Sequence, residues 1–141
     1  MNDAASGIEQ LELMLFRVNG VLFCSELRQV GGVFAPEEDV SPAASRLDDF
    51  FFGKPPNSQG NWKLIKLKAK QVGGSEWGFM AEEPEDIVNV SIDDLRPLPV
   101  IIEKLKHFKS LWGSFFYKDE IGLLLDLPGL YLEMQVGKNV F

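Results

Sequence analysis

The sequence contains very little of the residues that carry most enzyme chemistry. Its 141 residues include one cysteine, Cys24, and one histidine, His107. A single cysteine excludes an intramolecular disulfide, which fits a reducing compartment. One histidine and one cysteine are too few for the usual zinc ligand sets, and no acidic cluster has the spacing of a calcium loop. The sequence therefore predicts neither a metal nor a cofactor.

Long apolar runs and an excess of basic residues are also absent. No stretch approaches the roughly 20 apolar residues that cross a bilayer, and the first ten residues lack the basic start and apolar run of a signal peptide. The formal net charge is −7, which disfavours general binding to nucleic acid and to anionic lipid, because both need a basic face. We expect a cytoplasmic protein that neither inserts into a membrane nor binds nucleic acid.

Neither reactive side chain lies in a catalytic pattern. Cys24 ends an apolar run, where a free cysteine acts as a small hydrophobe, and its neighbours supply no positive charge to stabilise a thiolate. His107 has no candidate partner nearby in the sequence. The pairs Gly31-Gly32 and Gly73-Gly74 lack the spacing of a phosphate-binding loop and indicate turns. We predict that the protein is not an enzyme.

Apolar residues, in contrast, are abundant and fall in short segments typical of strands. Hydrophobic residues make up 45% of the chain and charged residues 25%, as in a globular domain. Alternation over 11–24, with Asn19-Gly20 at its centre, predicts a β-hairpin. Further strands are predicted at 62–72, 77–81, 87–90, 111–117 and 121–127.

Two short helices are predicted between these strands. Ser41-Pro42 is typical of a helix start and Gly53 of a helix end. The apolar spacing over 101–108 predicts a second short helix. The segment 25–33 fits either a helical turn or a bent strand.

Five short segments of the C-terminal half follow one another in a distinctive order. They are 77–82, 86–90, 92–99, 111–116 and 121–127. Together with the hairpin at 15–23, their order and spacing resemble the CheW-like domain family of chemotaxis coupling proteins, over roughly residues 11–132. The resemblance implies a mainly β fold of two small five-stranded SH3-like β-barrels with short helices. Such a domain would cover 11–135, after a disordered lead-in at 1–10 and before a tail at 136–141.

The sequence departs from the family pattern at one important place. The family has a strand ending in Leu-Arg-Gly between its opening hairpin and an "Asp-Leu" segment. Here only Gly31–Ser45 separates the hairpin region from Leu47-Asp48, and no Leu-Arg-Gly occurs. We expect this strand to be missing and one barrel to be incomplete. Because that strand contributes to partner contacts in the family, no interface residue is carried over from it.

The resemblance implies a non-enzymatic signalling adaptor or scaffold, of the kind that links chemoreceptors to a CheA-type histidine kinase. The alternative is a self-associating β-rich domain, since an open strand edge recruits another chain. A small-molecule enzyme would need convergent polar groups in an apolar cleft, and the sequence shows none. The residues proposed for protein binding are Phe34, Phe52, Lys66 and Lys68. Core packing is the competing interpretation for the two phenylalanines, and a solvated face for the lysines.

Overall fold

The computed structural model describes residues 9–35, 44–52, 62–68, 77–99 and 108–140; for 44–46, 48–49, 52, 83–85 and 136–140 it describes the backbone alone. The strands are β1 (Gln10–Val18), β2 (Val21–Glu26), β3 (Val30–Phe34), β4 (Ala44–Arg46), β5 (Trp62–Leu67), β6 (Gly78–Ser91), β7 (Leu111–Tyr117) and β8 (Glu120–Leu125). The helices are η1 (Leu27–Gln29), α2 (Leu47–Phe52), η4 (Ile92–Asp94) and α3 (Leu127–Val140).

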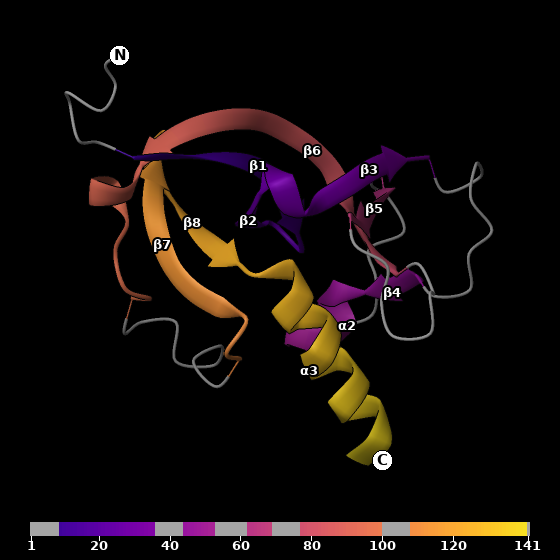
Figure 1. Ribbon diagram of the computed structural model, residues 1–141. Helices are drawn as coiled ribbons and strands as arrows, with labels where there is room; N and C mark the ends of the chain where they lie inside the picture. The colour runs from indigo at the N-terminus through magenta and orange to yellow at the C-terminus, as the bar shows by residue number, and fades with distance from the viewer. Residues whose placement is uncertain (1–8, 36–43, 53–61, 69–76, 100–107, 141) are drawn as a thin grey trace.

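All eight described strands belong to one mixed sheet. Its order is β3-β5-β6-β1-β2-β8-β7, with β4 paired to β6. In Figure 1 the long β6 arches over β1, with β7 and β8 on one side and β3, β4 and β5 on the other. The prediction of a mainly β fold with short helices is confirmed. None of the described helices is long and apolar enough to span a membrane.

The predicted hairpin is formed by β1 and β2, which pair antiparallel from Leu13↔Glu26 to Val18↔Val21. Its turn residues, Asn19 and Gly20, have φ of 53° and 81°, as a type I′ turn requires. The ambiguous segment that follows contains both of the structures considered for it, because η1 is a helical turn and β3 a strand.

The hairpin separates two hydrophobic cores, because its alternate side chains point to opposite faces. The first core contains Met14, Phe16, Val18 and Phe23 from the hairpin, with Leu47, Phe51, Ile65, Phe79, Leu123, Leu125, Leu127 and Leu130 among others. The second core contains Leu13, Leu15, Leu22, Cys24, Val90, Phe115 and Leu124. The second core is therefore enclosed by β1, β2, β7, β8 and the C-terminal half of β6.

Strand β6 replaces the two short strands that were predicted at 77–81 and 87–90. It is a single strand of 14 residues. The long β1 pairs with it on both sides of an irregularity, where Leu15 is opposite Asp86 and Arg17 is opposite Glu82. Pro84 falls within this irregularity, a position that tolerates a residue without a backbone N–H. The proline interrupts the pairing but does not end the strand.

The helix predicted from Ser41 to Gly53 is correct only in its second half. Residues 44–46 form β4, which pairs parallel with Gly78–Met80 of β6, so the prediction is wrong there. Pairing with a distant strand outweighs the local helix signal. The predicted helix start and end, and the helix predicted at 101–108 up to residue 107, lie outside the described residues.

Helix α3 was not predicted, and it extends through Val140 into the segment that was expected to be a tail. Asp126 caps its first turn: the carboxylate accepts a hydrogen bond from Gly129 N–H at 3.0 Å. Gln29 of η1 completes the start of the helix, since its Nε2 donates to Asp126 Oδ1 at 2.9 Å and its Oε1 accepts from Leu127 N–H at 3.0 Å. Trp77 packs edge-on against Tyr131 of this helix, 5.4 Å between ring centroids.

Removing the cap should destabilise the protein measurably. We expect Asp126→Ala to lower the free energy of unfolding by about 1–2 kcal/mol, because the N–H of Gly129 and the amide of Gln29 lose their acceptor. Urea unfolding followed by tryptophan fluorescence measures the change. Asp126→Asn is the matched control and should lose less, since it retains an oxygen for the cap. Equal losses for the two variants would contradict the capping role.

Candidate protein-binding surfaces

The residues proposed for protein binding lie at the β3 end of the sheet. Phe34 is paired with Leu64, and Gly32 with Lys66. The Phe34 ring lies over Gly32, where a Cβ would be 2.7 Å from two ring atoms. Lys66 Nζ is 5.1 Å from the centroid of the same ring, a cation–π distance. The structure therefore brings Phe34 and Lys66 together, both half-buried.

The other two proposed residues are placed less closely. Lys68 is exposed just beyond the end of β5, and its backbone N–H donates to Gln29 O at 2.9 Å. Phe52 is the last residue of α2, and its side chain lies outside the described part of the structure. We call Phe34, Lys66 and Lys68 the β3–β5 patch. In the described sheet β3 is an end strand, so the patch lies beside an unpaired strand edge.

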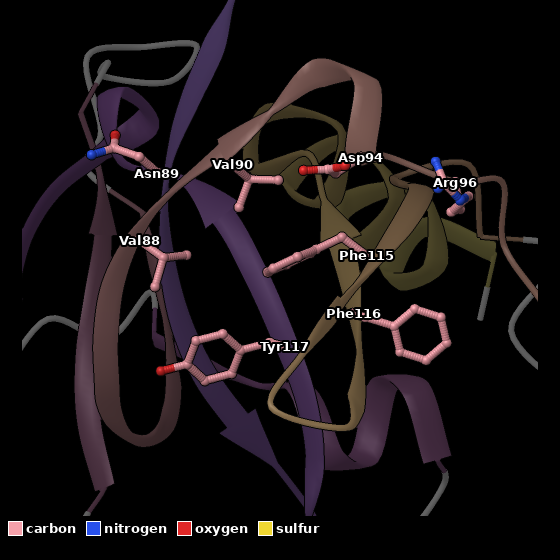
Figure 2. A pocket seen from close by; sticks show the side chains of 8 residues that line it. All are labelled: Val88, Asn89, Val90, Asp94, Arg96, Phe115, Phe116 and Tyr117. Carbon is pink, nitrogen blue, oxygen red and sulfur yellow. The ribbon is translucent and has the colours of Figure 1, made fainter.

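A second surface, which the sequence did not indicate, is a groove of about 500 Å³ between β6 and β7. Figure 2 shows the residues that line it, which are Val88, Asn89, Val90, Asp94, Arg96, Phe115, Phe116 and Tyr117. The side chains of Phe115 and Val90 point toward one another and belong to the second core. Phe116 points the opposite way from Phe115 and is 73% exposed. We call this site the β6–β7 groove.

Hydrogen bonds join the two sides of the β6–β7 groove near each of its ends. At one end Arg96 and Ser114 exchange two backbone hydrogen bonds of 2.8 Å each. Gly113 permits this close approach, because a Cβ there would lie 2.9 Å from the carbonyl oxygen of Arg96. At the other end the Tyr117 hydroxyl donates to the Asp86 carboxylate at 2.8 Å. In the described part of the chain no ladder of hydrogen bonds joins β6 to β7 between these ends.

The charges around the groove are mainly negative. Asp86, Asp93 and Asp94 are exposed, and no described residue forms an ion pair with Asp93 or Asp94. Arg96 is the cation of the lining, and its Nη1 donates to the backbone carbonyls of Asp93 and Leu95 at 3.0 and 3.1 Å. Lys118 lies beside the Tyr117 ring, 5.1 Å from its centroid. Two carboxylates of the rim therefore remain without a cationic partner in the described residues.

The position of Cys24 does not suit a nucleophile. Cys24 is fully buried in the second core, and burial raises the pKa of its thiol far above the usual range. Its Sγ lies 3.6 Å from the carbonyl oxygen of Leu123, which accepts its hydrogen bond. No described group of histidine, cysteine and acidic side chains could hold a metal ion. His107 lies outside the described residues.

No protein-family model matches the sequence. No curated protein matches it either. The fold does have a counterpart among solved structures, the scaffolding protein TtCheW from Thermoanaerobacter tengcongensis. The two superpose with a TM-score of 0.65 at 13% sequence identity, over 84% of this chain and 86% of the other. The CheW-like fold that the sequence pattern suggested is thus supported by structure, while the low identity limits the likeness to the fold.

Alkylation of Cys24 tests whether its buried thiol is unreactive in the folded protein. Because the thiolate is the reactive form, we expect Cys24 to stay unmodified by iodoacetamide in the folded protein at about pH 8 and to react fully in urea. Mass spectrometry of the intact chain measures both. Complete alkylation of the folded protein would contradict the placement of Cys24 in the second core.

Proposed function

We propose that this protein is a non-enzymatic signalling adaptor that links a chemoreceptor to a CheA-type histidine kinase in the cytoplasm. The observation that carries the proposal is the likeness of its fold to a scaffolding protein over most of both chains. The order of sequence segments that resembles the CheW-like family points to the same function. The described surface offers strand edges and exposed apolar side chains, which agrees with a role in binding.

The β3–β5 patch is the proposed contact for one of these partners. It combines an aromatic ring, two lysines and an edge of β3 with which no described strand pairs, and an acidic segment of a partner would complement the lysines. Arrangements of this kind are typical of interfaces, where aromatic residues supply apolar contact and charges set orientation. The expected loss of the family's Leu-Arg-Gly strand makes this edge the place where binding differs from that of the family.

Binding to the two partners tests the proposal. The full chain should bind both the regulatory domain of the CheA-type kinase and the cytoplasmic tip of the chemoreceptor from the same organism. We expect Lys66→Glu to weaken one of these interactions by about tenfold, because it reverses a charge within a contact. Surface plasmon resonance measures the affinities, with Lys109→Glu as the control, since Lys109 is exposed outside the patch.

Two outcomes would contradict the proposal. The first is no detectable binding to either partner by the unmodified chain. The second is a concentration-dependent oligomer in sedimentation velocity that Lys66→Glu and Phe34→Ala abolish, because this result would assign the patch to self-association. The open edge of β3 favours that alternative, whereas the net charge of −7 on every copy opposes it.

A further inference from the structure

Among the described strands, none pairs with the edge of β7 that faces the β6–β7 groove, beyond the single bridge to Arg96. In an antiparallel ladder, successive residues direct their backbone N–H and C=O groups alternately to the two sides. Ser114 exchanges its backbone hydrogen bonds with Arg96, on the side away from β8. Phe116, two residues further on, therefore directs its N–H and C=O to that same outer side, beyond the end of the Arg96 bridge.

Strand β6 presents a second edge to the same groove, and over residues 86–91 no described strand pairs with it on the side away from β1. The Ile92 N–H donates to Glu9 O at 3.0 Å, on the side of β1. By alternation, Val90 and Val88 also direct their backbone groups to β1, while Asn89 and Ile87 direct theirs away from it. The Ile87 N–H accordingly donates at 3.1 Å to the side chain of its neighbour Asp86 and not to another strand. Within the described part of the chain, both edges thus direct backbone groups that no strand ladder uses toward the groove.

We propose that the β6–β7 groove binds an extended peptide segment of a partner protein as an added strand. Backbone hydrogen bonds to Phe116 supply much of the affinity, and alternate apolar side chains of the peptide lie over Phe115 and Val90. Addition of a strand to an open sheet edge is a recurring mode of peptide recognition, in which backbone bonds give affinity and alternate side chains give specificity.

The negative charges at the rim of the β6–β7 groove indicate which charged residues the peptide carries. Asp93 and Asp94 lack cationic partners among the described residues, so lysine or arginine next to the apolar residues of the peptide complements them. A second copy of this chain fits poorly, because each copy carries a net charge of −7. The inference concerns a surface separate from the β3–β5 patch and does not depend on which receptor or kinase that patch binds.

Selection from a peptide library tests the inference. Random peptides of about nine residues, longer than an average strand, are displayed on phage and selected on the full chain. We expect the enriched sequences to alternate apolar and basic residues. The most enriched peptide is then synthesised with a fluorescent label, and its affinity is measured by anisotropy, together with a version in which glutamate replaces each lysine and arginine.

Two substitutions at one position separate backbone pairing from side-chain contact. Phe116→Pro removes the outward N–H, and an edge position tolerates proline. Phe116→Ala removes the exposed ring but retains the N–H. We expect about a tenfold loss of affinity for Phe116→Pro and less than about threefold for Phe116→Ala, since the ring points away from Phe115. Leu132→Ala, at another exposed apolar residue, is the matched control and should bind normally.

The results of these binding measurements can support or overturn the proposal. If Phe116→Pro does not fold, backbone pairing is tested with two sets of peptides, N-methylated at odd or at even positions. One of the two sets should lose binding. Failure to enrich any peptide overturns the proposal, as do equal losses for Phe116→Pro and Phe116→Ala, or tighter binding of the glutamate version. A dimer in sedimentation that Phe116→Pro dissociates also overturns it, by assigning the groove to a second copy.

Discussion

The alternation of side chains along the β1–β2 hairpin is the constraint on which the rest of the structure depends. Leu13 and Leu15 fill the second core, while Met14 and Phe16 fill the first. Because a shift of one residue would exchange the side chains of a strand between the two faces, the Asn19-Gly20 turn fixes which hairpin side chains enter each core. Strands β5, β6, β7 and β8 also contribute side chains to these cores, and α2 and α3 cover the first of them.

The features that could be predicted from the sequence are those decided by neighbouring residues. The hairpin and β7 are examples, because alternation and turn residues specify them locally. The strand at 44–46 and the continuity of β6 depend on pairing with distant segments, which a local pattern cannot show. Helix α3 was missed because Pro128 and Gly129 indicate a chain break, whereas Asp126 and Gln29 together use this position to start a helix.

The same difference between local and long-range features holds for the candidate surfaces. Sequence reasoning proposed Phe34 and Lys66 for protein binding without relating one to the other, and the structure brings them together because β3 and β5 are paired. The β6–β7 groove was missed, since its two edges come from segments that are separated in the sequence. The alternation of Phe115 and Tyr117 with exposed residues could indicate a half-buried strand, but not that the outer edge of that strand is unpaired.

Open edges beside well-packed cores are therefore the physical basis on which this CheW-like fold is proposed to bind other proteins. Backbone amide hydrogen exchange of the free protein, resolved to single residues, tests this most directly. The account predicts that the amides of Leu15 and Phe23 exchange slowly and that the amide of Phe116 exchanges much faster than those of Phe115 and Tyr117, whose backbone groups face β8. Slow exchange at Phe116, equal to that of its two neighbours, would show that the edge is paired and would contradict the account.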